Sequence, residues 1–229
     1  MDLIRRILKV WIFLALCGFA LVDFALFSVD NVISKYLKFS VIVACALLAY
    51  LIRENLHDLR DRRTIQIAAT LTVVADFLIG IMDQFLFGIG VFILVHSVYI
   101  FRHLRGFVSL KRELLIAVPV LIVSCIILYL AAPTTQKAGI LVPSIVYAFF
   151  LATSLYAGLG VKIRNFFPGE DQGEILTGII LFFITDIMVA LNAGLEGEAK
   201  QWTSIGIWLF YLPSQYFLAM SGYRRNPIV

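Results

Sequence analysis

The stretch TLTVVADFLIGIMDQFLFGIGVFILVHSVYIF, residues 70–101, is apolar along most of its length and is interrupted by a short polar turn, MDQ, at residues 82–84. Asp76 lies inside the first apolar run, and His96 lies inside the second. Together with its flanking residues, each run reaches the roughly 20 apolar residues that a helix needs to cross a bilayer. The stretch therefore predicts a transmembrane helical hairpin with an ionisable side chain in each arm.

The composition of the whole chain is that of an integral membrane protein. Of its 229 residues, 61% are hydrophobic and 15% are charged, and the mean hydropathy is +0.95. A soluble domain is about 45–50% apolar and about 25% charged. Cys17, Cys45 and Cys125 are scattered through apolar runs, so we expect small buried side chains there, without a disulfide framework or a metal cluster.

Apolar runs separated by segments rich in glycine, proline and charge predict eight transmembrane helices. The first run follows MDLIRRILK and has no small-residue cleavage pattern behind it, so we interpret it as a spanning helix or signal anchor. The expected ranges are 8–28, 37–52, 64–82, 84–104, 113–132, 138–158, 173–192 and 201–221. Because no connecting segment is long enough for a soluble domain, we expect an all-α bundle that forms a single transmembrane domain, residues 1–229.

The basic residues are distributed unevenly between the two sides of this expected bundle. Eight antiparallel helices place most of the 19 Lys and Arg residues on one side, and the other side receives only Lys35, Lys38, Lys137 and Lys200. Cytoplasmic loops carry the excess of Lys and Arg, so we expect both termini to be cytoplasmic. The net charge of +4 then reflects topology, and we expect no nucleic-acid partner. A multi-pass protein of an inner or plasma membrane is the expected localisation.

Three carboxylates, those of Asp23, Asp76 and Asp186, fall inside predicted spans. A charge at the bilayer centre costs at least about 2.5–3.5 kcal/mol, so such groups usually face a cavity or a partner. Asp76 follows Thr64, and Asp186 follows Glu174, by roughly 18 Å of helix rising in the same direction. The two carboxylates should therefore lie at nearly the same depth. Asp23 lies nearer a helix end, where a structural hydrogen bond is as reasonable as a functional role.

The helix that follows each of these two aspartates carries polar and aromatic side chains along one face. In residues 84–104 this face consists of Gly88, Phe92, His96, Tyr99 and His103. In residues 201–221 it consists of Ser204, Trp208, Tyr211, Gln215 and Leu218. The segment FILVH, residues 92–96, is echoed by YLPSQ, residues 211–215. The two hairpins are consistent with a repeated unit, although chance similarity between apolar segments would give the same pattern.

Several of these side chains also have a purely structural explanation. A histidine in a spanning helix often forms one interhelical hydrogen bond, worth about 0.6 kcal/mol. Packing aromatics are the corresponding interpretation of Tyr99, Tyr147 and Tyr211. His57 and His103 lie at the expected cytoplasmic edges, where we expect them to be solvated. The structural explanation is weakest for Asp76 and Asp186, because a buried carboxyl group must find a partner or stay protonated.

The chemistry that suits these groups is acid–base catalysis. The chain lacks a G-x-S-x-G elbow, an H-E-x-x-H motif and a cysteine with an evident base. Two carboxyl groups in a site of low dielectric repel each other, so one stays protonated while the other is ionised. Glycosidases use this arrangement on an acetal, through an oxocarbenium-like state. Asp76 and Asp186 are therefore the candidate acid and base, with His96 as support.

These residues also resemble the motifs of a known family. The segment ADFLIGIMDQFLFGIGVFILVHSVYI, residues 75–100, resembles the Asp, F-x-x-G-x-x-x-F-x-x-x-H-x-x-Y block of the YhhN-like lysoplasmalogenase family of membrane proteins. GIILFFITDIMVALN, residues 178–192, resembles the F-x-x-S-D block, and Tyr211 with Gln215 resembles the closing Y-x-x-x-Q. The eight-helix layout is similar too. Ala75 replaces the usual Gly and Thr185 the usual Ser, which retains both carboxylates and allows a shifted substrate.

The resemblance implies hydrolysis of the vinyl ether of a lysoplasmalogen to a fatty aldehyde and a glycerophospho-alcohol. In the mechanism that we infer, one aspartic acid protonates the vinyl carbon distal to the oxygen, and the other aspartate stabilises the oxocarbenium ion and activates water. Which of Asp76 and Asp186 holds the proton stays open. The residues expected to position water, carboxylates or glycerol are His96, Tyr99, Tyr147, Tyr211 and Gln215. No cofactor or metal is expected, and the partner is an alkenyl lysophospholipid of the bilayer.

Two other classes of function stay open at this point. A small proton-coupled transporter would also use repeated hairpins with intramembrane aspartates. A zinc-dependent intramembrane lipid amidase or esterase could combine His96 with Asp76 and Asp186, although the spacing does not require a metal. The sequence also leaves the roles of Asp23 and Asp83 open.

Overall fold

The computed structural model describes residues 2–26, 31–52, 59–106 and 108–223, and these residues form helices and no strands. The long helices are α1 (Asp2–Leu26), α2 (Val32–Tyr50), α3 (Leu59–Asp76), α4 (Phe85–His103), α5 (Leu110–Lys137), α6 (Leu141–Leu159), α8 (Gly169–Asn192) and α9 (Gly197–Met220). Two short elements accompany them, the π-helical turn η1 (Phe77–Ile81) and α7 (Val161–Arg164). The prediction of an all-α bundle with eight long helices is confirmed.

Within the described residues, seven of these helices are long and apolar enough to cross a membrane, α1 to α6 and α8. The eighth, α9, lacks a continuous stretch of comparable hydropathy, and its Tyr211, Ser214 and Gln215 are buried inside the bundle. A helix with such a polar face is accommodated where protein surrounds it rather than lipid. The chain is therefore a multi-pass membrane protein.

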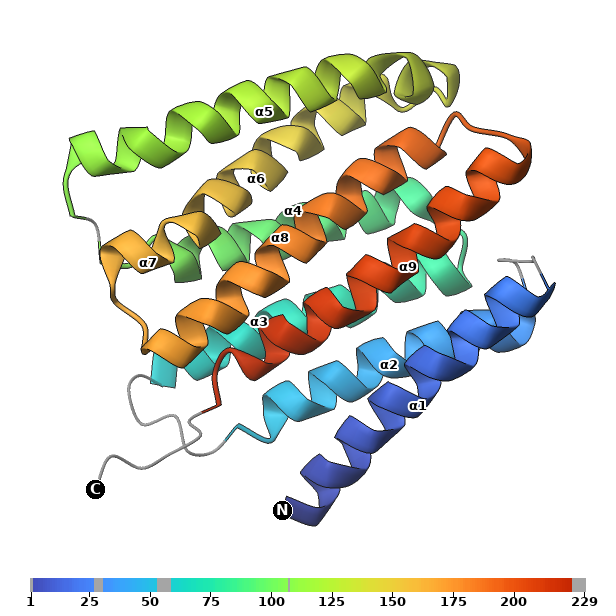
Figure 1. Ribbon diagram of the computed structural model, residues 1–229, viewed down its shortest axis with the longest axis horizontal. Helices are drawn as coiled ribbons and strands as arrows, with labels where there is room; N and C mark the ends of the chain where they lie inside the picture. Colours follow the sequence, from blue (N-terminus) through green and yellow to red (C-terminus); the bar gives the residue numbers. More distant parts are fainter. Residues whose placement is uncertain (1, 27–30, 53–58, 107, 224–229) are drawn as a thin grey trace.

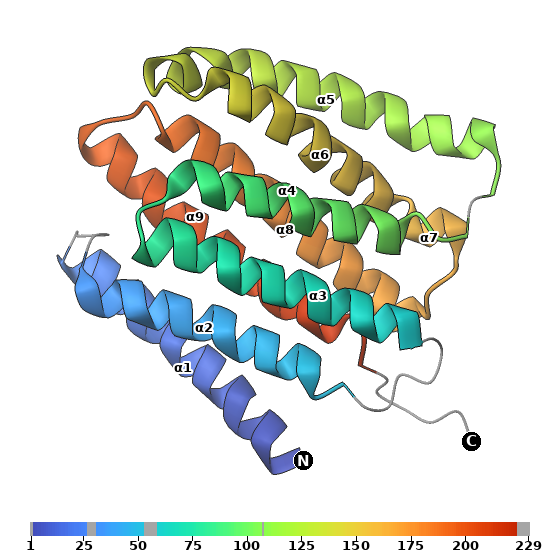
Figure 2. The same ribbon diagram turned by 180° about the vertical axis from the view of Figure 1, so that it is seen from behind.

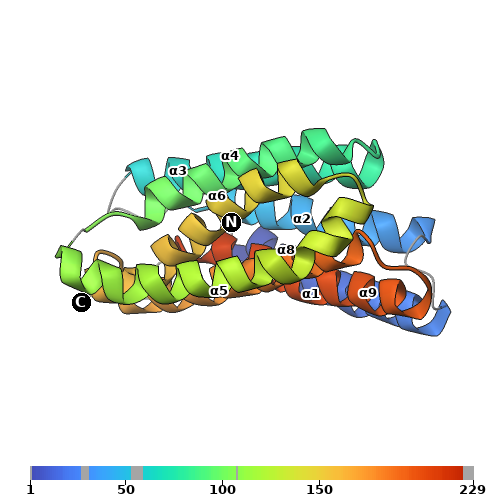
Figure 3. The same ribbon diagram turned by 90° about the horizontal axis from the view of Figure 1, so that it is seen from above.

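The helices run antiparallel along the bundle, with α1 and α2 at one edge and α5 at the other (Figure 1). The α8–α9 pair lies in front in Figure 1, whereas the α3–α4 pair lies in front in the reverse view of Figure 2. The view in Figure 3 separates the same two pairs, with α3 and α4 on one side and α8 and α9 on the other. The two hairpins expected from the sequence thus face each other across the bundle. Their origin from a repeated unit stays a prediction.

Glycines set the spacing of the helices around α8. A Cβ atom at Gly178 would lie 2.7 Å from Leu218 Cγ of α9, and one at Gly158 of α6 would lie 2.8 Å from Ile179 Cγ2 of α8. These distances leave no room for a larger residue at either glycine. Membrane helices pack closely through such small residues, since lipid supplies no hydrophobic driving force between them.

Several helices extend beyond their expected ranges. α1 begins at Asp2, α5 continues to Lys137, and α2 begins at Val32, where Asn31 caps the helix by accepting a hydrogen bond from the Ile33 N–H at 2.8 Å. The expected boundaries followed the ends of the apolar runs. The helices continue past those ends because polar residues near a membrane surface are helical as readily as apolar ones.

Lys38 shows the largest consequence of this difference. It was expected at the edge of a span, but it lies within α2 and is 2% exposed. Its Nζ is 2.5 Å from Oδ2 of Asp23 in α1, which is completely buried. The ion pair stabilises both charges inside the bundle, because a buried charge needs an opposite charge nearby. Asp23 therefore has the structural partner that the sequence left open.

The cysteines do not all behave as expected. Cys45 is buried, as predicted, but Cys17 and Cys125 are exposed. The two exposed cysteines lie on α1 and α5, the helices at the edges of the bundle, so their outward faces have no protein neighbour. All three are free thiols.

A cluster of buried ions closes the end of the bundle at which α4 and α9 finish, which we call the Arg102 end. The guanidinium of Arg102 donates hydrogen bonds of 2.8 and 3.1 Å to the two carboxylate oxygens of Asp61 in α3. It also donates to Oγ of Ser221 at 2.7 Å and to the Ser221 carbonyl at 2.9 Å. Since Arg–carboxylate forks are strong and directional, Arg102 ties α3, α4 and the end of α9 together.

A second fork lies beside the first. Arg164 of α7 donates to the carboxylate of Glu113 in α5 at 2.9 and 2.5 Å, and to the carbonyls of His103 and Ala157, both at 2.9 Å. The Tyr156 hydroxyl of α6 donates to Glu113 at 2.6 Å. This contact joins α5, a helix at the edge of the bundle, to the centre.

His103 lies between these two arginines and is fully buried, so the expectation that it is solvated is wrong. Its Nε2 is 3.4 Å from Nη1 of Arg102, and its ring stacks on that of Tyr99 with centroids 5.5 Å apart. The buried arginines close the end of the bundle over the imidazole. The sequence shows only an apolar run that ends in charged residues, and it does not show that these charges are buried. His57 lies outside the described residues.

Candidate active site

Asp76 is the last residue of α3 and is 7% exposed. The helix continues directly into the wider π-helical turn η1, a feature that occurs frequently at functional sites because it changes the direction of the side chains around it. The hydroxyl of Tyr211 in α9 donates a hydrogen bond of 2.5 Å to Oδ2 of Asp76. The carboxyl group is thus held by a helix from the opposite hairpin.

Asp186 of α8 is held by two groups that also contact each other. The Tyr147 hydroxyl of α6 donates to Oδ2 of Asp186 at 3.0 Å, and Nε2 of His96 in α4 lies 3.4 Å from the same oxygen. Nε2 of His96 is also 2.9 Å from the Tyr147 oxygen. Because the one hydroxyl hydrogen of Tyr147 goes to Asp186, the tyrosine oxygen accepts from His96, which places a hydrogen on Nε2.

Each of the two carboxyl groups contacts a side chain from the opposite hairpin. Asp76 of the α3–α4 hairpin is bound by Tyr211 of the α8–α9 hairpin, while Asp186 of α8 lies against His96 of α4. Neither hairpin alone would supply both contacts. The site therefore exists only when the two hairpins face each other.

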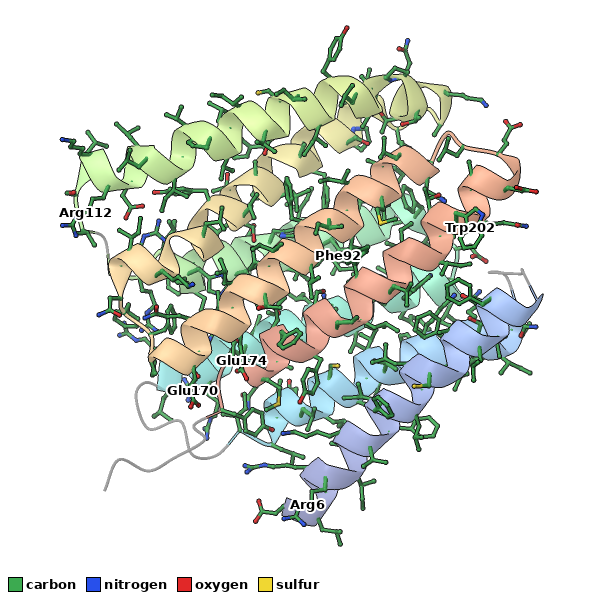
Figure 4. The ribbon with its side chains drawn as sticks, in the orientation of Figure 1. Arg6, Phe92, Arg112, Glu170, Glu174 and Trp202 are labelled. Atoms are coloured by element: carbon green, nitrogen blue, oxygen red, sulfur yellow. The ribbon has the colours of Figure 1, made fainter. Side chains whose placement is uncertain are left out.

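Aromatic rings fill the space around these polar groups. The ring of Phe182 lies 4.8 Å from that of His96 and 5.6 Å from that of Tyr211, measured between centroids. Phe92, midway along the bundle in Figure 4, meets the Tyr211 ring edge to face at 6.2 Å. Such packing surrounds the polar groups with apolar atoms, so the hydrogen bonds among them are stronger than they would be in solvent.

Asp76 and Asp186 line one cavity of about 170 Å³. The Tyr147 and Tyr211 hydroxyl-bearing side chains contribute to its wall, and most of the remaining wall is apolar. The apolar part comes mainly from Ile89 and Phe92 of α4, Ile127, Leu128 and Ala131 of α5, and Phe183, Ile187 and Val189 of α8. The arrangement combines two carboxyl groups with space for an apolar ligand, and it is consistent with the similar depths predicted for the two residues.

A family model for the YhhN family matches residues 33–222, which cover α2 to α9. The chain belongs to the YhhN family. Neither the curated proteins nor the solved structures contain a match to it. The match includes both aspartates and every residue described above that binds them.

Two residues expected at the site of this YhhN protein lie elsewhere. Tyr99 and Gln215 are absent from the wall of the 170 Å³ cavity and instead line a separate cavity of about 10 Å³, with Thr72 and Cys45, nearer the Arg102 end. That volume is close to the space one water molecule needs. His96, Tyr147 and Tyr211, in contrast, are brought together around the two aspartates.

Sequence reasoning missed two parts of the YhhN site. Phe182 precedes Asp186 by one helical turn, so the same face-counting that selected the residues of α4 would have found it. The wall contributed by α5 had no such signal, because its residues are apolar and lie in the run with the highest mean hydropathy, 2.9.

A third cavity, of about 310 Å³, borders the same aspartate. Asp76, Ile79 and Trp208 line both this cavity and the one of 170 Å³. The other residues of its wall include Lys35 and Lys38. Among the residues that the structure describes, no three His, Cys, Asp or Glu side chains are arranged to hold a metal ion, here or elsewhere.

Proposed function

We propose that this protein is an intramembrane hydrolase that cleaves the vinyl ether bond of lysoplasmalogens, releasing a fatty aldehyde and a glycerophospho-alcohol. The observation that carries the proposal is that Asp76 and Asp186 line one largely apolar cavity, each with a tyrosine hydroxyl on one carboxyl oxygen. A vinyl ether is cleaved through protonation of carbon, and its alkenyl chain is apolar. The cavity offers both an acid and an apolar wall.

The surroundings of the two carboxyl groups support different roles for them. Asp186 accepts a hydrogen bond from Tyr147 and lies 3.4 Å from Nε2 of His96, so a negative charge is best stabilised there. Asp76 receives one hydrogen bond from the described residues, that of Tyr211. We therefore assign the proton to Asp76 as general acid and the charge to Asp186. Two carboxyl groups in different surroundings commonly divide these roles.

The reaction then proceeds in three balanced steps. Asp76 transfers its proton to the vinyl carbon distal to the ether oxygen, which leaves an oxocarbenium ion beside the Asp186 carboxylate. Water adds to the cationic carbon while Asp186 takes one of its protons, and a hemiacetal forms. The hemiacetal hydroxyl returns a proton to Asp76 as Asp186 protonates the leaving oxygen. Aldehyde and alcohol separate, and both aspartates are restored.

The carboxylate beside the reacting carbon acts mainly by electrostatics. An oxocarbenium ion carries its charge on atoms that an apolar cavity would otherwise destabilise, and an ionised Asp186 supplies the opposite charge without reorganisation of solvent. Tyr147 and His96 hold that carboxylate in position.

The test uses purified protein and a 1-alkenyl lysophospholipid, with aldehyde release as the readout. We expect Asp76→Asn and Asp186→Asn each to lower kcat at least about 100-fold, which is the usual contribution of a general acid or base. Asp2→Asn, which removes a carboxylate from a side chain that is 84% exposed, is the matched control and should keep full activity. Full activity in either site variant would remove that residue from the catalytic pair, and an inactive, folded wild type would reject the reaction.

A small proton-coupled carrier is the second candidate, and one observation favours it. Asp76 borders cavities on two sides, as a proton-binding group in a transport pathway would. Protein in liposomes would then couple proton movement to uptake of a solute without any covalent change. Aldehyde release that occurs without proton flux would exclude this candidate.

A further inference from the structure

The 310 Å³ cavity differs in chemistry from the apolar cavity on the other side of Asp76. It lies at the end of the bundle opposite the Arg102 end, between α2, η1 and the beginning of α9. Its wall includes the ammonium-bearing side chains of Lys35 and Lys38 and the carboxylate of Asp83. A polar cavity thus meets an apolar one at Asp76.

The two lysines of this wall are in different situations. Lys38 is buried and its charge is offset by Asp23 at 2.5 Å. The Lys35 side chain is 37% exposed, and its Nζ is 4.0 Å from Oδ1 of Asp83, whose side chain is 86% exposed. That separation is well beyond the 2.7–2.9 Å, roughly, of a charge-assisted hydrogen bond. Lys35 and Asp83 therefore form a loose pair that a ligand can separate.

A lysoplasmalogen has an apolar part and a polar part, as the two cavities together do. Its vinyl ether is the point at which an apolar chain joins a polar glycerophosphate, and the proposed acid, Asp76, is the point at which the apolar cavity joins the polar one. A substrate whose vinyl carbon reaches Asp76 with its chain in the apolar cavity must extend its glycerol and head group toward the polar cavity. Asp83 follows Asp76 by seven residues, beyond the π-helical turn η1, and lies in the wall of this polar cavity.

Resting on the proposed function, we propose that this polar cavity binds a zwitterionic phospholipid head group, with the phosphate on Lys35 and the amine on Asp83. Lysine is a common phosphate ligand, and its charge would be shared with the phosphodiester rather than with Asp83. The released Asp83 carboxylate then pairs with the ammonium of ethanolamine or choline.

The charges of the wall also predict a preference among head groups. Lys35 and Asp83 together are neutral, and the Lys38–Asp23 pair is neutral as well. A zwitterionic head group leaves this balance unchanged. A lysophospholipid with a phosphate and no amine brings uncompensated negative charge near the Asp83 carboxylate, so it should bind more weakly.

The test measures binding and is independent of catalysis. Purified protein is titrated with two uncleavable ligands, a 1-O-alkyl glycerophosphocholine and the matching 1-O-alkyl glycerol that lacks the head group. We expect Lys35→Gln to weaken binding of the phosphocholine lipid at least about tenfold, the usual effect of losing a hydrogen bond to a charged group, and to leave the alkyl glycerol unchanged. Unchanged alkyl glycerol binding also shows that the variant is folded.

The controls separate this proposal from the reaction itself. Lys137→Gln removes a lysine that pairs with Glu196 outside the cavity, and it should bind both ligands as the wild type does. Asp83→Asn should weaken the choline lipid and strengthen a 1-O-alkyl glycerophosphate. If Lys35→Gln has no effect, or affects both ligands equally, the head-group site is rejected even when the aldehyde assay succeeds. If the phosphocholine lipid binds more tightly than the alkyl glycerol and Lys35→Gln removes that difference, the head-group site is supported even when the aldehyde assay fails.

Discussion

The hydroxyl of Tyr211 in α9 donates its hydrogen bond to Asp76 in α3, a residue 135 positions earlier in the chain. The contact joins two hairpins that meet only in the folded bundle, and it leaves the second oxygen of Asp76 available for a proton. Tyr147 makes the equivalent contact with Asp186. A phenol on each carboxyl group is thus the shared feature of the two halves of the candidate site.

Replacement of Tyr211 with Phe should lower kcat about 10- to 100-fold. The variant loses one hydrogen bond to the proposed acid, worth about 1.5–3 kcal/mol when the partner is charged, and keeps the ring that packs on Phe92 and Phe182. Aldehyde release at saturating substrate is the measurement. Tyr129→Phe, at an 80% exposed position, is the control. Wild-type kcat in Tyr211→Phe would show that Asp76 does not depend on this hydrogen bond.

His96 and Tyr147 should act as one unit on Asp186. Since Nε2 of His96 contacts both the tyrosine oxygen and the carboxylate, His96→Gln and Tyr147→Phe each disturb the same arrangement. The double variant should therefore lose less activity than the product of the two single losses, with a coupling of about 0.5–3 kcal/mol. A double-mutant cycle on kcat/KM measures it. Strictly multiplicative losses would mean that the two residues act independently.

The two aspartates and His96 could be found from sequence because helical geometry converts chain position into depth and face. Twelve-residue offsets from charged ends placed Asp76 and Asp186 at one level, and both do line one cavity. Tyr99 and Gln215 were selected by the same periodicity, but they line a different cavity. One face of a helix runs along its whole length, whereas the cavity at the aspartates contacts only part of that face. Which helix supports which carboxyl group depends on helix packing, and periodicity within one helix contains no such information.

Replacement of Arg102 with Met should destabilise the bundle by about 3–5 kcal/mol, because the change leaves the buried Asp61 carboxylate without its fork. The midpoint of thermal unfolding in detergent should fall accordingly. Arg112→Met, at an exposed position of α5, is the matched change and should shift the midpoint little. An unchanged midpoint for Arg102→Met would show that the other residues of the cluster compensate for the loss of Arg102.

Two glycines should respond in opposite ways to the same change. Gly178→Ala places a Cβ 2.7 Å from Leu218 Cγ and 3.2 Å from its backbone nitrogen, so α8 and α9 must separate, at a cost of about 1–3 kcal/mol. Gly90→Ala in α4 meets no atom within 4 Å and should stabilise the helix by up to about 1 kcal/mol. Thermal unfolding of the two variants provides the comparison. Equal shifts would mean that helix propensity, not contact with α9, controls position 178.

Treatment with a strong chelator should leave aldehyde release unchanged. The proposed steps move protons between Asp76, Asp186, water and substrate, and they require no Lewis acid. Activity of dialysed, chelator-treated protein is measured beside elemental analysis of the untreated sample. A loss of activity that a stoichiometric amount of zinc restores would favour the metal-dependent amidase or esterase that the sequence left open.

The fold was predictable where apolar runs are continuous and less so where charges are paired inside the bundle. Counting apolar residues located eight helices, and the turn at MDQ separates η1 from α4 as expected. Lys38 and His103 were assigned to aqueous edges because each follows or precedes charged residues in the chain. Their partners, Asp23 of the neighbouring helix for Lys38 and Arg164 of α7 for His103, come from other segments of the chain, and this compensation is visible only in three dimensions.

The fork of Arg102 also constrains how such a chain can be made. Asp61 is synthesised before Arg102, but Ser221, which accepts two of the four hydrogen bonds, follows α9. Until that last helix enters the membrane, a guanidinium with unused donors faces either water or lipid, and the first is far less costly. Biogenesis should therefore hold the α3–α4 hairpin with its charged end at the aqueous boundary. Insertion of α9 then completes the bundle and the candidate site in one event, because the same helix brings Tyr211 to Asp76.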